Sequence, residues 1–103
     1  MIQHTVVYRL KHPLNSDKEK DFQEAIARLA DIPGVKHLRR HRQVSPKNKF
    51  TFGLSMEFAS MDDYRTYNEH PMHVDFVKNR WLQEVAAFME IDYTAYRKSG
   101  KSA

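Results

Sequence analysis

The feature that most constrains the fold is a strict alternation of side chains between residues 50 and 58. Every second residue there is large and apolar, whereas the residues between them are small or polar. The apolar set is Phe50, Phe52, Leu54, Met56 and Phe58. A period of two is typical of a β-strand with one buried face. The chain must therefore form a sheet, and other elements must cover one of its faces.

Three further strands are indicated by the same kind of pattern. Residues 2–10 alternate clearly, and His4 lies among the residues of the apolar face. Residues 35–44 are predicted as a strand, although basic side chains blur their alternation. A last strand is predicted from about Val85, where apolar and polar residues alternate again.

A capping motif predicts the first helix. Ser16 and Glu19 have the spacing of a capping box, and the helix behind them is expected to end at Pro33-Gly34. The apolar residues that recur at helical spacing are Phe22, Ala25, Ile26, Leu29 and Ala30. This stripe is expected to face the sheet.

The second helical region is predicted as two short helices. Ser60 is expected to begin the first of them. Pro71 is expected to begin the second, because proline is favoured at the first helical position, and His70 would then be its cap. The two stripes of larger side chains are Met61, Tyr64 and Tyr67, and then Val74, Val77 and Trp81.

The predicted fold class follows from this order of elements. The chain of 103 residues has the length of one domain. A β-α-β-β-α-α-β order with a four-stranded antiparallel sheet is an α+β, ferredoxin-like arrangement. We assign residues 1–97 to this domain and residues 98–103 to a polar C-terminal tail.

Composition excludes several classes of site and partner. The chain has no cysteine, which excludes disulfides, thiol nucleophiles and thiolate metal sites. Its basic run at residues 36–42 could hold phosphate or nucleic acid, but it is more typical of a solvated edge strand. The strand at residues 50–58 lacks the basic-Gly-aromatic signature of RNA-recognition sheets. Nucleic acid is therefore not expected as a partner.

Membrane and targeting segments are not expected either. No stretch reaches the roughly 20 apolar residues of a membrane-spanning helix. The first residues lack the basic region and apolar run of a signal peptide. A cytoplasmic location without a membrane partner is the expectation.

The segment from Tyr67 to Phe76 contains most of the candidate site residues. His73 could act as a base, kept neutral by the nearby helix N-terminus, and Tyr67 and His4 could donate hydrogen bonds to a carbonyl or enolate oxygen. Each also has a structural interpretation: His4 as a hydrogen-bonded core histidine, His70 as a cap, and His73 and Tyr67 as packing groups. The sequence leaves these alternatives open.

A metal site on the same residues is a further alternative. His4, His70 and His73 could supply three nitrogens, as in a catalytic zinc site. However, Pro71 breaks the helical spacing between two of them, and no carboxylate lies at a recognisable ligand spacing. We expect no metal and no cofactor.

Five motifs in order carry a family resemblance. They are Gln3–Val7, Ile32–Val35, Phe52–Phe58, Tyr67–Phe76 and the closing Asp92-Tyr93. Together they resemble the stress-responsive A/B barrel family, known as Dabb, of the dimeric α+β barrel superfamily. The resemblance implies a homodimer in which two four-stranded sheets form one barrel, with a cleft between each sheet and its helices. A plant relative is a cofactor-free cyclase, and its working residues correspond to His4, Tyr67 and His73.

Two functional hypotheses follow from the resemblance and the residues together. The first is a small homodimeric stress-responsive protein that binds an apolar or aromatic ligand between sheet and helices. The alternative is a cofactor-free, aldol-type cyclase or lyase with His73 as base and Tyr67 and His4 as donors. The residues expected to contact the ligand are Phe22, Ile26, Tyr64, His70 and Trp81.

Overall fold

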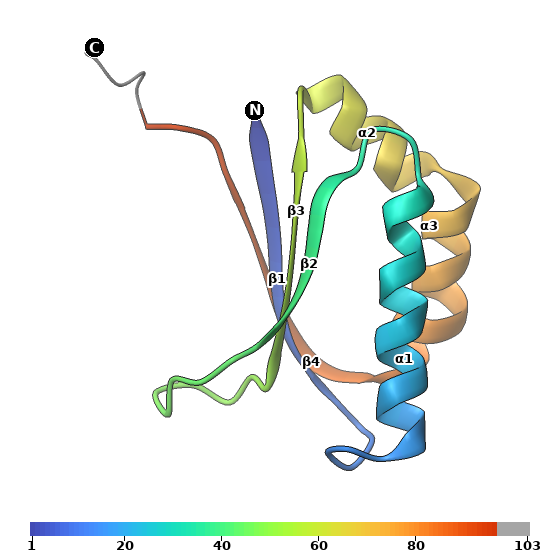
Figure 1. Cartoon of the computed structure of the whole chain (residues 1–103), viewed down its shortest axis with the longest axis vertical. Coiled ribbons are helices and arrows are strands. Elements are labelled where there is room, and N and C mark those ends of the chain that lie inside the picture. Colours follow the sequence, from blue (N-terminus) through green and yellow to red (C-terminus); the bar gives the residue numbers. More distant parts are fainter. Residues whose placement is uncertain (97–103) are drawn as a thin grey trace.

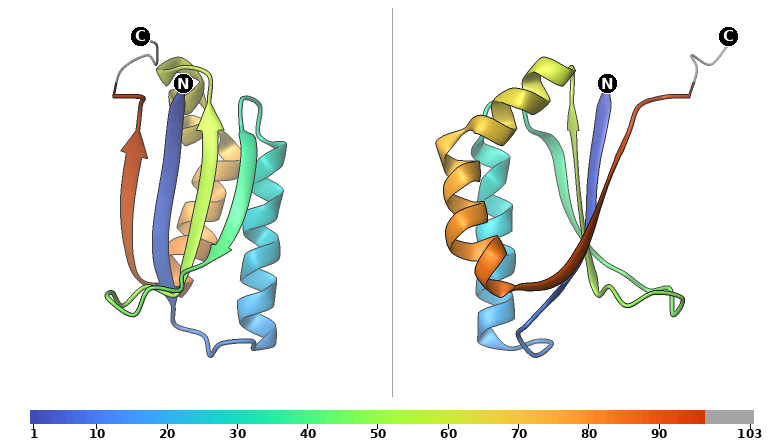
Figure 2. Two further views of the ribbon diagram at one scale, coloured as in Figure 1. Left: turned by 60° about the vertical axis from the view of Figure 1, so that its left-hand side comes forward. Right: turned by 180° about the vertical axis from the view of Figure 1, so that it is seen from behind.

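A computed structural model describes residues 1–96 and shows one sheet with all helices on one of its faces (Figure 1). The strands are β1 (Ile2–Leu10), β2 (Lys36–Arg42), β3 (Phe52–Phe58) and β4 (Val85–Tyr93). The helices are α1 (Asp17–Arg28), η1 (Leu29–Asp31), α2 (Met61–Glu69), α3 (Pro71–Phe76), η2 (Val77–Trp81) and α4 (Leu82–Glu84). The sheet is antiparallel with the order β2-β3-β1-β4, which confirms the ferredoxin-like fold (Figure 2). The polar tail expected at residues 98–103 lies outside the described residues.

The helix starts agree with the capping signals. The Ser16 side chain accepts a hydrogen bond from the Glu19 N–H, at 3.2 Å. The Glu19 carboxylate accepts from the Asn15 N–H rather than from Ser16, so it closes the preceding turn. Ser60 caps α2 by accepting from the Asp63 N–H. Side-chain acceptors thus satisfy backbone donors that a helix N-terminus leaves without partners.

Helical structure continues from Pro71 to Glu84 as α3, η2 and α4. The middle segment, η2, is a π-helix, a wider turn that occurs often at functional sites. Val77 and Trp81 lie at its two ends and pack against the core, as their stripe predicted. Val74 was predicted in the same stripe but is 51% exposed. Phe76 is buried on this run of helix instead.

The second strand is shorter than predicted, running from Lys36 to Arg42 rather than over residues 35–44. The predicted range is one residue too long at the start and two at the end, and the pairing inside the strand is irregular near its start. His37 adopts a left-handed backbone conformation with φ of 53°, and the pairing register with β3 shifts between Lys36 and Arg39. Such a bulge shortens regular pairing on an edge strand.

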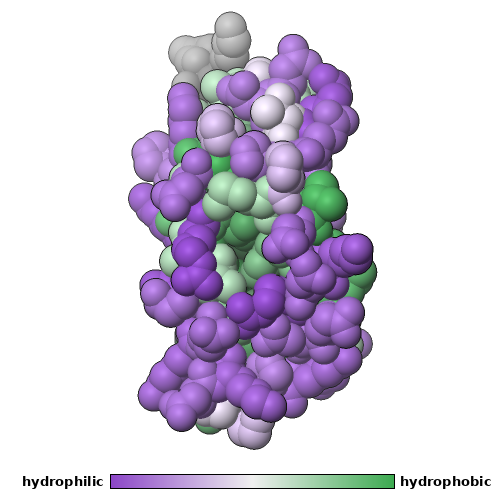
Figure 3. All heavy atoms as spheres, turned by 90° about the vertical axis from the view of Figure 1, so that its right-hand side faces the viewer, coloured by the Kyte–Doolittle hydropathy of each residue, from purple (hydrophilic) through white to green (hydrophobic). Residues whose placement is uncertain are grey.

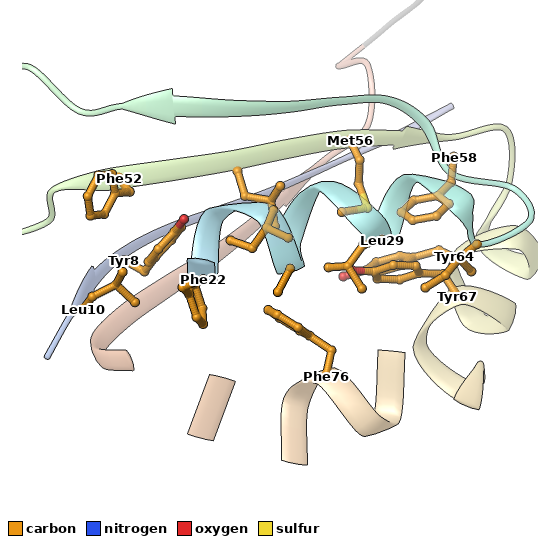
Figure 4. Close-up of a cluster of buried hydrophobic side chains, with 14 residues drawn as sticks. Tyr8, Leu10, Phe22, Leu29, Phe52, Met56, Phe58, Tyr64, Tyr67 and Phe76 are labelled. Atoms are coloured by element: carbon orange, nitrogen blue, oxygen red, sulfur yellow. The ribbon is translucent and has the colours of Figure 1, made fainter. Parts of the chain in front are cut away.

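The core lies between the sheet and the helices. Figure 4 shows Phe58, Tyr64 and Tyr67 at one end of the cluster and Tyr8, Phe22 and Phe52 at the other. All six side chains are buried, and they come from β1, β3, α1 and α2. This packing is the cover that the alternation in β3 required.

The second face of the sheet carries no helix in any of the views in Figures 1 and 2. Pairing register decides which β4 residues face which way. His4 is paired with Asp92 and Val6 with Glu90, so these acidic residues lie on the helix-covered face. Met89, Ile91 and Tyr93 therefore lie on the uncovered face, where they are 40–52% exposed, whereas Phe88, paired with Tyr8, lies on the covered face. Within residues 1–96, no helix has the length and apolar character needed to cross a bilayer.

Candidate functional site

A cavity of about 240 Å³ lies between the sheet and the second helical region. Three predicted site residues, His4, Tyr67 and His73, all line it. The rest of the lining comes from Val6, Leu29, Leu54, Asn68, Phe76, Val77, Trp81, Leu82, Phe88 and Glu90. On the helical side of the molecule, apolar side chains gather in the centre and polar ones surround them (Figure 3). The cavity thus has a polar end and an apolar body.

His73 has a defined orientation in this cavity. Its Nδ1 lies 3.1 Å from the Asn68 carbonyl oxygen, which can only accept, so Nδ1 carries the proton. Nε2 makes no hydrogen bond to any residue between 1 and 96 and is left as an acceptor in the neutral ring. Burial lowers the pKa of His73, although the hydrogen bond to Asn68 acts in the opposite direction. Burial, rather than the helix N-terminus considered from sequence, is therefore the main cause that favours the neutral imidazole.

His4 is held in place by the carboxylates of Asp92 and Glu90. It is 4% exposed, and its Nδ1 lies 2.6 Å from Asp92 Oδ1 and 3.4 Å from Glu90 Oε2. The Tyr64 hydroxyl also lies 2.9 Å from Nδ1. A carboxylate on Nδ1 fixes the tautomer and ring orientation of a histidine. The Nε2 of His4, like that of His73, has no partner among the described residues.

Tyr67 lies between the two imidazoles. Its ring centroid is 4.4 Å from that of His73 and 6.2 Å from that of His4. The residue is 2% exposed, yet its hydroxyl makes no hydrogen bond within the described part of the chain. Burial, together with the negative charge of Glu90, raises the pKa of Tyr67. Tyr67 can therefore donate a hydrogen bond to a molecule in the cavity and does not act as a base.

Tyr64 behaves differently, although it precedes Tyr67 by one helical turn. Its hydroxyl lies 2.9 Å from Glu90 Oε2 and 2.8 Å from Asp92 Oδ2, and can donate to either carboxylate. Burial and these two hydrogen bonds raise its pKa. Tyr64 does not line the cavity but positions His4 and the acidic side chains behind it.

The other predicted ligand contacts divide into three groups. Trp81 lines the cavity. Phe22 and Ile26 do not, because both are fully buried in the core. His70 is the N-cap of α3, where its Nδ1 accepts from the Met72 N–H at 3.1 Å, as its capping interpretation predicted.

Sequence reasoning missed two important polar residues, Glu90 and Asp92. From sequence, Glu90 is only a polar residue of an alternating strand, and Asp92 is only part of the closing motif of the family resemblance. The signal that identifies them is the register of β1 with β4, which pairs Asp92 with His4 and Glu90 with Val6. That register joins residues 88 positions apart and cannot be read from either strand alone.

Within residues 1–96, the same cluster also brings together three side chains that could bind a metal ion. The ligand atoms of His4, Glu90 and Asp92 lie within 4.8 Å of one another. Hydrogen bonds among them and from Tyr64 already use His4 Nδ1, Glu90 Oε2 and both carboxylate oxygens of Asp92. A cation would have to displace the proton between His4 and Asp92, so the arrangement suits proton sharing better. The three-histidine site considered from sequence is not assembled, because His70 caps α3 outside the cavity.

The chain is similar to a defined set of proteins. The model of the stress responsive A/B barrel domain matches residues 2–95. A stress-response A/B barrel domain-containing protein of Arabidopsis thaliana is 30% identical over 106 residues; this chain spans 40% of its length. A Dabb family protein with a ferredoxin-like fold from Mesorhizobium loti is 49% identical, with a TM-score of 0.91. That alignment covers 93% of this chain and 97% of the other.

More distant solved structures share the fold alone. A dimeric ferredoxin-like protein from Thermobifida fusca is 19% identical with a TM-score of 0.75, covering 91% of this chain and 90% of its own. A hydroxynitrile lyase from Passiflora edulis is 18% identical with a TM-score of 0.81, covering 94% of each chain.

Proposed function

The chain belongs to the stress-responsive A/B barrel family, and we propose that it binds a small apolar or aromatic molecule between its sheet and its helices as a homodimer. One observation carries the binding proposal. Tyr67 is buried and lines the cavity, and its hydroxyl has no hydrogen-bond partner among residues 1–96. A hydroxyl donor that the protein leaves open at the wall of a cavity is available to an oxygen atom of a ligand.

The lining of the cavity supports a small ligand. Its volume of about 240 Å³ lies just below the roughly 300–1,000 Å³ typical of sites for drug-sized molecules. Trp81, Phe88 and Leu82 form an apolar wall, and the polar groups are concentrated near Tyr67. These properties suit a molecule with a single ring or short chain and one polar head.

The uncovered sheet face supports the homodimer. Met89, Ile91 and Tyr93 form an exposed apolar strip on β4, and such strips mark protein interfaces. Ferredoxin-like neighbours of this fold include dimeric proteins.

Trp81 provides a direct test of ligand binding, because it is the only tryptophan in the chain and lines the cavity. We expect 3-phenylpropanol to cause a saturable change in Trp81 fluorescence and to shift amide resonances around Tyr67 and His73. His73→Ala should weaken this binding. A response that rises linearly with probe concentration and shifts no cavity resonance would reject the proposal.

A second candidate function, cofactor-free lyase or cyclase chemistry, is favoured by the state of His73. Its proton is fixed on Nδ1 and burial keeps the ring neutral by lowering its pKa, so Nε2 is available as a base. In an aldol-type step, Nε2 would remove a proton next to a carbonyl group of the ligand. The Tyr67 hydroxyl would donate to the carbonyl oxygen as negative charge develops on it, with His4 close by.

Deuterium exchange tests this step without knowledge of the natural substrate. In D₂O, the protein should speed exchange of the methylene protons of phenylacetone, followed by proton NMR. His73→Ala should lower that rate by about 10²-fold or more, the usual contribution of a general base. His41→Ala, a histidine change at an exposed position on β2 outside the cavity, is the control and should leave it unchanged. Equal rates for wild type and His73→Ala would remove the base role while leaving the binding proposal intact.

A further inference from the structure

The charge of the cavity lining is unlike that of the chain as a whole. The protein has seventeen Lys and Arg residues and a net charge of +4. Among the residues described, neither Lys nor Arg lines the cavity, and Glu90 is the acidic residue that does. A basic protein has thus folded with an acidic group at the polar end of its cavity.

Glu90 is held there by its neighbours. Its Oε2 accepts from the Tyr64 hydroxyl at 2.9 Å and lies 3.4 Å from His4 Nδ1. Its Oε1 makes no hydrogen bond to a residue in the described part of the chain. The side chain is 48% exposed, so the carboxylate faces the accessible part of the site rather than the core.

Asp92 adds to this negative charge from behind. Its Oδ2 lies 2.8 Å from the same Tyr64 hydroxyl, so two carboxylates share one O–H donor. The field of Glu90 also reaches the groups across the cavity, since it acts to raise the pKa of both Tyr67 and His73. A bound anion would meet this charge without a lysine or arginine to offset it.

We propose that Glu90 makes the cavity selective for uncharged ligands, an alcohol, aldehyde or ketone with an apolar body, and excludes carboxylates of the same shape. This assignment rests on the proposed ligand-binding function and specifies its ligand class. A cationic head is not favoured either. Tyr64 and His4 already contact the carboxylate, and the rest of the lining is largely apolar, which penalises a desolvated ammonium group.

Three probes of one shape test the charge selectivity: 3-phenylpropanol, 3-phenylpropionate and 3-phenylpropylamine, each followed by Trp81 fluorescence at neutral pH. Wild-type protein should bind the alcohol about tenfold or more tightly than the carboxylate, because like charges a few ångströms apart repel strongly in a partly buried site. In Glu90→Gln the carboxylate should recover several-fold, with little change for the alcohol. Asp31→Asn removes one negative charge from an exposed position on η1 and should leave the ratio unchanged.

Several outcomes would overturn the assignment. Equal binding of alcohol and carboxylate by wild type would do so, as would tighter binding of the amine, and neither result depends on a variant that must fold. An unchanged ratio in Glu90→Gln would show that another group sets the selectivity. If none of the three probes gives a saturable change in wild type or variant, the ligand-binding function itself fails, and the assignment with it.

Discussion

At the scale of single residues, one helical turn separates two buried tyrosines with opposite roles. Tyr64 donates its hydroxyl to the acidic pair behind His4, whereas Tyr67 lines the cavity and its hydroxyl has no partner among residues 1–96. In each of the two imidazole rings, one nitrogen is hydrogen-bonded by the described part of the protein and the other is not. Each has Nδ1 fixed by the protein, and neither Nε2 has a partner in the described residues. The site therefore combines hydrogen-bonding atoms that the protein already uses with others that remain open to a ligand.

This difference predicts that a change to phenylalanine lowers stability at Tyr64 but weakens ligand binding at Tyr67. Tyr64→Phe should lower the free energy of unfolding by about 1–3 kcal/mol, because it removes a donor from two partly buried carboxylates. Tyr67→Phe should leave stability nearly unchanged and weaken binding of 3-phenylpropanol several-fold. Urea unfolding and Trp81 titration measure the two quantities. A large loss of stability in Tyr67→Phe would mean that its hydroxyl is already satisfied within the protein.

At the scale of elements, the helical run from Pro71 to Glu84 is anchored at its C-terminal end. Glu84 accepts from Arg80 Nε at 2.5 Å and lies 2.7 Å from His12 Nε2, just beyond β1. Arg80 also pairs with Asp21 on α1, at 2.8 Å. This network joins three elements beside the end of η2 and so positions Trp81 in the cavity wall.

The network predicts a stability loss on the acid side. Burial would raise the pKa of Glu84, but hydrogen bonds from Arg80 and His12 outweigh it, and the net effect lowers the pKa below its usual 4.5. A carboxyl group whose pKa is lower in the folded chain stabilises the fold above the unfolded pKa, and this contribution is lost as pH falls through the folded value.

Glu84→Gln should therefore cost about 1.5–3 kcal/mol at pH 7, the usual range for hydrogen bonds to a charged group. The difference from wild type should shrink steadily below about pH 4.5, as measured by urea unfolding from about pH 7 to pH 3. Glu69→Gln, on the exposed end of α2, is the control and should change little at either pH. A difference that stays constant over the whole range would contradict the role of Glu84.

At the scale of the whole molecule, the sheet has one covered and one uncovered face (Figure 2). The uncovered face presents apolar residues on β4, and the connection between β2 and β3 projects on the same side (Figure 1). A chain this small gains much from burying such a strip against a second copy. Pairing would leave the cavity on the helical side of each sheet.

The homodimer predicts a mass in sedimentation near twice 12.2 kDa at micromolar concentration. Ile91→Glu should shift this mass toward that of the monomer, because it places a charge in the apolar strip. Val74→Glu introduces the same group at a similarly exposed position on α3 and should leave the dimer intact. A monomeric wild type would reject the homodimer.

Much of the fold was predictable because its signals are local. Alternation defined β1 and β3, Ser16 and Ser60 marked helix starts, and Pro71 marked the break in the second helical region. The predicted range of β2 was one residue too long at its start and two at its end, and the left-handed conformation of His37 inside it has no signature in a basic strand. The three residues predicted to act in the site line one cavity, while their chemical roles stay predictions.

The sequence by itself determined the elements, their order and the sheet face that carries His4, since each follows from spacing within a short segment. Only the tertiary structure decided which side chains contact His4. Pairing of β1 with β4 brings Asp92 and Glu90 onto the covered face, and the β4 pattern alone does not distinguish its two sides. Register is set by the packing of the whole sheet against its helices. The acidic end of the cavity, and the ligand class inferred from it, therefore emerged only from contacts between the two ends of the chain.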